Sequence, residues 1–218
     1  MMLKLLIFDL DGTLADTGRD ITDALNYALG PFGVRAYSIE ETKAMVGSGI
    51  SKLLASLLPV NDEGTRRLVT DRFISYYSQH VVDYTAAYPH VKETLAQLDR
   101  YKKAVVSNKR EVLSKEVLRG IGILQYFDIV WGSDSVRAMK PSPVPIFDLM
   151  NMFHALPEET AIIGDSNYDV EAGKAAGVKT IAVTYGFRSR EVLKGADFII
   201  DRFDDVLNVL YQINETGY

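Results

Sequence analysis

Residues 3–14 read LKLLIFDLDGTL. A nearly continuous apolar run over residues 3–8 stops at two aspartates, Asp9 and Asp11, and the glycine Gly12. Short apolar runs of this kind are typical of parallel strands that are covered on both faces. We therefore expect a buried strand that presents two carboxylates at its C-terminal end.

Similar apolar runs return later in the chain and alternate with helical patterns. Strands are predicted at 103–107, 127–131, 160–164, 179–183 and 197–200. Apolar spacings of three and four predict helices at 91–98, 112–118, 146–153, 170–176 and 203–213. This alternation from about residue 89 to the end predicts an α/β fold built on a doubly wound parallel sheet.

Residues 16–86 interrupt that alternation. Their apolar residues follow helical spacings around 21–29, 53–58 and 68–77, and no strand is predicted among them. We expect residues 16–86 to form a helical cap inserted into an α/β core of residues 1–15 and 87–218. The hinges are expected near residues 15–16 and 85–89, and a chain of 218 residues has room for such a core and cap.

The composition excludes several classes of function. A net charge of −5 and a pI near 5.3 argue against a nucleic-acid-binding protein. The absence of cysteine excludes disulfides, thiolate metal sites and a thiol nucleophile. No apolar run approaches the ~20 residues of a membrane helix, and the N-terminal run is too short for a signal peptide. We expect a cytoplasmic protein with no membrane partner, and the oligomeric state is not predicted.

The pair Asp9 and Asp11 points to a metal. Side chains alternate along a strand, so these two carboxylates point the same way. Two carboxylates at close range repel, and one takes up a proton unless a cation lies between them. Mg²⁺ prefers carboxylate, water and phosphate oxygens as ligands. A polar turn that ends a strand is the alternative, but such a turn does not require the second aspartate.

Three further polar sites also follow predicted strands. Ser107 and Asn108 can donate hydrogen bonds to phosphate oxygens, although such residues also cap helices. Lys140 precedes a proline that restricts its backbone and could hold the ammonium inward. Asp165 could supply another metal carboxylate, and Asp169 is placed where the next helix begins. In open α/β sheets ligands bind at the carboxyl edge, so the coincidence of four such sites predicts one active site there.

These four motifs resemble, in order and spacing, those of the haloacid dehalogenase superfamily of phosphohydrolases. The resemblance rests on residues 9–14, on Ser107, on Lys140 with the proline after it, and on residues 164–166 with Asp169. The helical insert is similar to the small cap of that superfamily's first cap class. Residues 46–49, 105–109 and 184–186 are together similar to the phosphoglycolate phosphatase branch.

The resemblance implies a role for each residue. Asp9 is expected to attack phosphorus and Asp11 to act as the acid and base. Mg²⁺ is expected to bind the Asp9 carboxylate, the Asp11 backbone carbonyl and Asp165, with Asp169 orienting the site from its edge. The groups expected to hold the transferring phosphoryl oxygens are Ser107, Asn108 and Lys140. The implied substrate is a small phosphate monoester, and 2-phosphoglycolate fits the narrower branch.

One loop of the cap is a candidate for substrate recognition. Gly47, Ser48 and Gly49 precede a predicted helix, and free backbone N–H groups at such a position attract anions. An ordinary helix start at Ser48 is the alternative. If the loop faces Asp9 across the cleft, an acidic leaving group such as a carboxylate suits it.

Other functions remain open from sequence. A sugar phosphomutase of the same superfamily uses the same two aspartates but returns the phosphoryl group to the product. A phospho-accepting or otherwise non-catalytic binding module also pairs an aspartate, Mg²⁺ and a lysine. Dehalogenases and phosphonate hydrolases of the superfamily lack an aspartate at the position of Asp11, and its transport ATPases carry lysine at that of Leu10.

Overall fold

A parallel sheet of six strands forms the centre of the molecule. The structure is a computed structural model that describes residues 2–58 and 62–216. The strand order is β5-β4-β1-β6-β7-β8, and every neighbouring pair in this sheet is parallel. The strands are β1 (Leu5–Phe8), β4 (Lys102–Val106), β5 (Ile129–Trp131), β6 (Thr160–Gly164), β7 (Lys179–Val183) and β8 (Phe198–Ile200). The prediction of a doubly wound α/β fold is confirmed.

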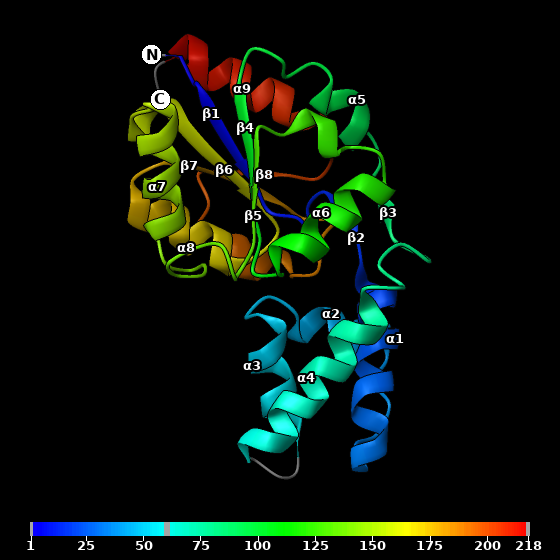
Figure 1. Cartoon of the computed structure of the whole chain (residues 1–218). Helices are drawn as coiled ribbons and strands as arrows, with labels where there is room; N and C mark the ends of the chain where they lie inside the picture. Colours follow the sequence, from blue (N-terminus) through cyan, green and yellow to red (C-terminus); the bar gives the residue numbers. More distant parts are fainter. Residues whose placement is uncertain (1, 59–61, 217–218) are drawn as a thin grey trace.

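Helices cover both faces of this sheet (Figure 1). On one face Leu5 and Ile7 pack with α7 (Val144–Phe153) and α8 (Asn167–Ala176). On the other face Leu6 and Phe8 share a core with α5 (Val91–Leu95), α6 (Glu111–Gly120) and α9 (Asp205–Thr216). All four residues of β1 are buried, which explains why an uninterrupted apolar run forms this strand.

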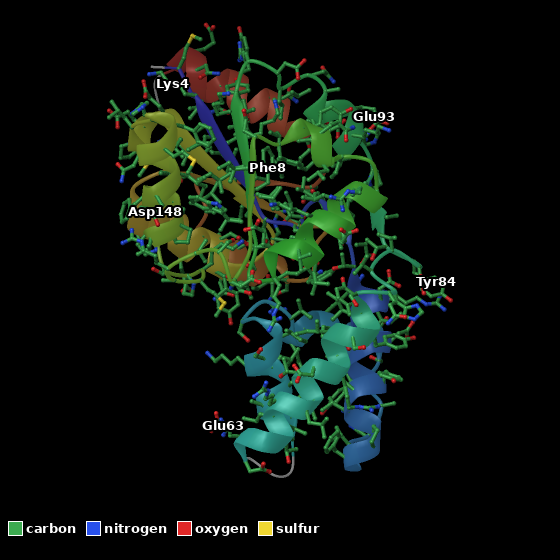
Figure 2. All side chains as sticks on the ribbon, in the orientation of Figure 1. Lys4, Phe8, Glu63, Tyr84, Glu93 and Asp148 are labelled. Atoms are coloured by element: carbon green, nitrogen blue, oxygen red, sulfur yellow. The ribbon has the colours of Figure 1, made fainter. Side chains whose placement is uncertain are left out.

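Four α-helices form a separate group beyond the carboxyl edge of the sheet (Figure 1). They are α1 (Gly18–Leu29), α2 (Ile39–Met45), α3 (Ile50–Leu57) and α4 (Glu63–Tyr77). Figure 2 shows Phe8 inside the α/β part and Glu63 near the far tip of this helical group. A short antiparallel ribbon, β2 (Ala15–Asp16) with β3 (Ala86–Ala87), joins the two parts of the chain. We propose that this ribbon is the hinge between core and cap.

The cap differs from the prediction in two elements. The helix α2 was missed because it has seven residues with only Thr42 buried, so it shows no apolar stripe. Its signal is instead a capping box, in which Ser38 and Glu41 satisfy each other's backbone N–H groups. The ribbon was missed because each of its strands has two residues, which is too short for an alternating pattern.

The boundaries of several other elements shifted by a few residues. The helix expected at 91–98 ends at Leu95, and the one expected at 170–176 begins at Asn167. Helix ends are the least predictable positions because capping and packing, and not apolar periodicity, decide them. Among residues 2–58 and 62–216, no helix is both long and apolar enough to cross a membrane.

One buried carboxylate ties the first cap helix to the residues that lead into β3. Asp20 is 2% exposed, and it accepts hydrogen bonds from the backbone N–H groups of Tyr84 and Thr85 and from the Thr85 hydroxyl at 2.7–3.1 Å. These contacts join residues 64 or 65 positions apart in sequence. The start of α1 and the return of the chain to the core are therefore fixed together.

Replacing Asp20 tests this connection. Asp20→Ala leaves buried donors without an acceptor, and each such group costs about 1–3 kcal/mol. We expect the free energy of unfolding, measured by urea titration, to fall by about 2 kcal/mol. The exposed Asp23, on the same helix, is the control, and Asp23→Ala should change it by less than about 0.5 kcal/mol. Equal effects of the two substitutions would contradict this role of Asp20.

Candidate active site

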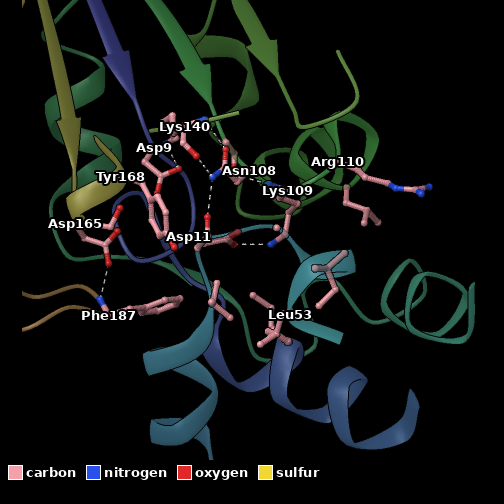
Figure 3. Close-up of a pocket in the computed structure, with 18 of the residues that line it drawn as sticks. Asp9, Asp11, Leu53, Asn108, Lys109, Arg110, Lys140, Asp165, Tyr168 and Phe187 are labelled. Atoms are coloured by element: carbon pink, nitrogen blue, oxygen red, sulfur yellow. Dashed lines mark hydrogen bonds and ion pairs between the residues drawn. The ribbon is translucent and has the colours of Figure 1, made fainter. Parts of the chain in front are cut away.

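The ends of β1, β4 and β6 bring the aspartates and their partners to one place (Figure 3). Phe8, the last residue of β1, pairs with Val105 on one side and Ile163 on the other. The backbone N–H of Asp9 donates to Ile163 at 2.9 Å and so extends this register by one residue. Parallel pairing therefore sets Asp9 level with the residues that end β4 and β6.

Three carboxylates meet at this edge. Ligand oxygens of Asp9, Asp165 and Asp169 all lie within 4.8 Å of one another, and all three residues are buried. Burial raises the pKa of Asp9 to about 7, against the pull of Lys140. Burial, with repulsion from Asp9 and Asp169, also raises the pKa of Asp165 well above its ordinary value. In the absence of a cation, protons are thus the counter-charge that this cluster favours.

Lys140 balances only part of that charge. Its Nζ lies 2.8 Å from Asp9 Oδ1 and 2.6 Å from Asp169 Oδ1, and its side chain is 2% exposed. Burial alone lowers the pKa of Lys140, but the carboxylates of Asp169 and Asp9 raise it above its ordinary value, so the ammonium stays charged. The remaining oxygen of Asp169 accepts from the Ser166 N–H and hydroxyl. Asp169 therefore acts on Asp9 through Lys140.

Asp165 lacks an ion pair among the described residues, and its surroundings are fitted closely to it. Its Oδ2 accepts from the Phe187 N–H at 2.6 Å, and its Oδ1 lies 3.4 Å from the Thr13 hydroxyl. A Cβ at Gly12 would lie 2.2 Å from Asp165 Oδ2, and one at Gly186 would lie 2.3 Å from Asp165 Cβ. These positions need glycine because the backbone approaches the carboxylate so closely.

The donor set fits a hard divalent cation. Three ionised carboxylates and the Lys140 ammonium leave a net charge of −2, which one divalent ion balances. All the ligand atoms on offer are oxygens, and Mg²⁺ prefers oxygen ligands. Asp9 and Asp165 were predicted as metal ligands, whereas Asp169 was expected only at the edge. The spacing of Asp9 and Asp11 predicted a cation between their two carboxylates, and the resemblance implied only the Asp11 backbone carbonyl as a ligand. The Asp11 carboxylate lies outside the cluster, in a different environment.

The Asp11 carboxylate is held by a separate group of residues. Its Oδ1 lies 2.5 Å from Lys109 Nζ and accepts from the Thr17 hydroxyl at 2.6 Å. Lys109 also donates to the hydroxyl of Tyr77, at the end of α4, at 2.9 Å. Asp11 therefore has its own cation, and Figure 3 shows this pair beside the Asp9–Lys140 pair.

Ser107 and Asn108 follow β4, and they differ in how many of their hydrogen-bond donors already have a partner. The amide nitrogen of Asn108 donates to the carbonyl oxygens of Gly47 and Lys140, at 2.7 and 2.9 Å. Both of its N–H groups are thus occupied in this arrangement, where a phosphoryl contact was expected. The Ser107 hydroxyl accepts from the Lys109 N–H at 3.2 Å, and its own proton remains to be donated.

The cap loop reaches the core through backbone carbonyls. Gly47 and Gly49 have φ of 135° and 89°, and both line the cavity above the aspartates. Gly49, not Ser48, is the residue that precedes α3, and it makes no side-chain cap. From the core, the Arg188 guanidinium donates to the carbonyls of Lys43, Ala44 and Val46 at the end of α2. Arg188 and Asn108 thus fix this loop over the site.

The cavity between cap and core is small and has one apolar wall. Its volume is about 70 Å³, below the ≈ 300–1,000 Å³ of pockets for drug-sized ligands. The floor carries the aspartates together with Ser107, Lys109 and Lys140. The cap contributes the side chains of Ile21, Val46, Ile50, Leu53 and Phe73, and Figure 3 shows Leu53 on the side opposite Asp9. A compact phosphate ester suits this space.

Sequence reasoning missed several residues of the site. Lys109 directly follows the motif residues Ser107 and Asn108, so its position on the same loop was an available signal. Tyr77 was assigned only to the apolar face of a helix, and Arg188 follows residues 184–186, which carried part of the family resemblance. Their roles depend on which parts of the fold face each other, and local sequence does not contain that information.

Proteins of similar sequence agree with the family resemblance of the motifs. The family model described as haloacid dehalogenase-like hydrolase matches residues 6–183. A phosphoglycolate phosphatase of Aquifex aeolicus is 34% identical over 210 residues, covering 95% of this chain and 97% of that protein. One of Haemophilus influenzae is 33% identical over 219 residues, covering 95% and 98%.

Solved structures of similar fold agree with these sequence relatives. The crystal structure of a predicted phosphoglycolate phosphatase from Haemophilus somnus aligns with a TM-score of 0.89 at 29% identity, covering 96% of this chain and 98% of that one. A predicted phosphatase from Clostridium acetobutylicum aligns with a TM-score of 0.86 at 26% identity, covering 97% and 100%. The predicted resemblance is confirmed in sequence and in fold.

The raised pKa of Asp9 makes cation binding depend on pH. Below about pH 7 the cation-free site holds a proton on Asp9, and a cation must displace it. We expect the affinity for Mg²⁺, measured by calorimetry, to be weaker at pH 6 than at pH 8. Calorimetry in buffers of different ionisation enthalpy should detect proton release at the lower pH. An affinity that is constant across this range would contradict the assignment of Asp9 as a ligand.

Proposed function

The chain belongs to the haloacid dehalogenase-like hydrolases and is a phosphoric monoester hydrolase of the phosphoglycolate phosphatase-like kind, and we propose that it works through a phosphoryl group bound covalently to Asp9. The observation that carries this proposal is the environment of the two aspartates. Asp9 lies in the cluster of three carboxylates that could hold a metal ion, and Asp11 lies outside it with its own lysine. Two carboxylates in different environments can take different roles.

The proposed reaction has two steps. An Asp9 carboxylate oxygen attacks phosphorus, the bond from phosphorus to the leaving oxygen breaks, and Asp11 gives that oxygen its proton. Asp11, now a carboxylate, then takes a proton from water while the water oxygen attacks phosphorus. The bond from phosphorus to Asp9 breaks, inorganic phosphate leaves, and both aspartates return to their starting forms.

The other residues position the substrate and balance its charge. Lys140 and the Ser107 hydroxyl lie on the cavity floor beside Asp9, where the phosphoryl oxygens must be held. Asp9, Asp165 and the Asp11 backbone carbonyl would hold Mg²⁺, which would supply positive charge to the phosphoryl group in transfer. During the first step, the cap over the cavity limits the entry of water.

We propose 2-phosphoglycolate as the substrate. The support is the name carried by relatives that match almost the whole chain, and the small volume of the cavity. Three of the cationic residues that line this cavity already donate hydrogen bonds to protein oxygens. They are Lys109, Lys140 and Arg188. The loop of Gly47, Ser48 and Gly49 is proposed to contact the leaving group, with Gly47 and Gly49 at the cavity wall.

Replacing the nucleophile gives the first test. In Asp9→Asn an amide takes the place of the carboxylate, so the nucleophile and one negatively charged metal ligand are lost together. We expect phosphate release to fall by at least about 10³-fold, within the range of catalytic effects for such residues. Circular dichroism should show an unchanged fold. Activity within tenfold of wild type, in a preparation free of other phosphatases, would contradict the assignment.

A substrate panel tests the second part of the proposal. We expect kcat/KM for 2-phosphoglycolate to exceed that for hexose phosphates by at least about tenfold, because a small cavity of about 70 Å³ favours the more compact ester. Phosphate release is the measured quantity, which also distinguishes a hydrolase from a phosphomutase. A hexose phosphate that is preferred, or converted to its isomer without release of phosphate, would overturn this assignment.

A further inference from the structure

A chain of two hydrogen bonds connects the cap to the Asp11 carboxylate. The Tyr77 hydroxyl accepts from Lys109 Nζ at 2.9 Å, and the same nitrogen lies 2.5 Å from Asp11 Oδ1. Tyr77 is fully buried, and the side chains of Lys109 and Asp11 are 7% and 10% exposed. Buried contacts of this kind hold their partners in one geometry because few other donors or acceptors are within reach.

The three residues come from different parts of the fold. Tyr77 ends the cap helix α4, Lys109 follows β4 in the core, and Asp11 follows β1. The Tyr77 hydroxyl can reach Lys109 only while α4 lies against the carboxyl edge of the sheet. A cap that swings away on the β2–β3 ribbon would remove this hydroxyl from the site.

The contacts on Asp11 are unequal between its two oxygens. Lys109 and the Thr17 hydroxyl both donate to Oδ1, and no described residue donates a hydrogen bond to Oδ2. A carboxyl group anchored through one oxygen presents the other in a fixed direction. Oδ2 is therefore the oxygen that is left to face the substrate.

We propose that Tyr77 and Lys109 are positioning residues that hold Asp11 for proton transfer when the cap is closed. This inference rests on the proposed function, because it assigns the partners of its acid and base. Burial alone lowers the pKa of Lys109, but the nearby Asp11 and Tyr77 raise it above its ordinary value, so its ammonium remains available to both partners. Burial raises the pKa of Tyr77 to about 12, so its hydroxyl stays protonated and accepts from the ammonium with its lone pairs.

The loss of activity caused by a displaced Asp11 should depend on the leaving group of the substrate. An alkyl oxygen, as in 2-phosphoglycolate, must receive a proton as it departs, whereas p-nitrophenolate departs as an anion. Loss of the Asp11 position should therefore lower kcat/KM for the alkyl ester and spare it for p-nitrophenyl phosphate. General acid–base catalysis contributes roughly 10²–10⁴-fold, so a partial loss of position is readily measured.

The experiment compares Tyr77→Phe and Lys109→Met with wild type on both substrates. For 2-phosphoglycolate we expect kcat/KM to fall about tenfold in Tyr77→Phe and about 100-fold in Lys109→Met, with little change in KM. For p-nitrophenyl phosphate kcat/KM should stay within about twofold of wild type. In an Asp11→Asn background, Tyr77→Phe should cause no further loss, because residues that act through one group are not additive.

Tyr76→Phe is the matched control. Tyr76 is the preceding residue on α4, and it stacks on Tyr27 and His80 away from the cavity. Thermal unfolding of all variants should be checked first, and Tyr76→Phe should leave kcat/KM unchanged on both substrates.

Two results would overturn the inference. Equal losses on both substrates would show that Tyr77 and Lys109 support only the fold of the cleft. A rise in KM for 2-phosphoglycolate alone, with kcat unchanged, would show that Lys109 binds the substrate carboxylate directly. If wild type hydrolyses other alkyl monoesters but not 2-phosphoglycolate, only the substrate assignment fails, and the same comparison is made with the fastest alkyl ester.

Discussion

The site depends on an excess of negative charge buried at one edge of the sheet. Asp9, Asp165 and Asp169 lie close together, and Lys140 pairs with only two of them. Buried charges are costly unless they are paired, so this arrangement favours either protons or a divalent cation. A cation there also attracts a phosphoryl group. The separate pairing of Asp11 with Lys109 keeps a second carboxylate beside the cluster and outside it.

The cap contacts the core at the same edge of the sheet. The cap meets the core through Arg188, Asn108 and Lys109, and each of these residues also contacts, or lies next in sequence to, a group on the catalytic floor. Arg188 follows Phe187, whose N–H binds Asp165. The same short loops therefore hold both the acidic groups and the cap.

The sequence predicted the core well and the cap less well. Asp9 and Asp165 follow apolar runs that form β1 and β6, and strand pairing alone brings such positions together. Tyr77 was unpredictable as a site residue because its position depends on how α4 lies over the sheet. Asn108 is instructive, since its sequence context predicted a phosphate ligand, and its amide also holds Gly47 of the cap, which the sequence did not predict. Local pattern identifies a residue's element, but tertiary packing decides its partner.

The most direct test of the account is detection of the covalent intermediate. Enzyme mixed with substrate and Mg²⁺ is quenched in acid within the first turnover, digested and examined by mass spectrometry. The account predicts one phosphoryl group on the peptide that contains Asp9, and its absence from the same peptide of Asp9→Asn. Turnover of substrate with no phosphorylated aspartate at any quench time, or with the phosphoryl group on another residue, would contradict it.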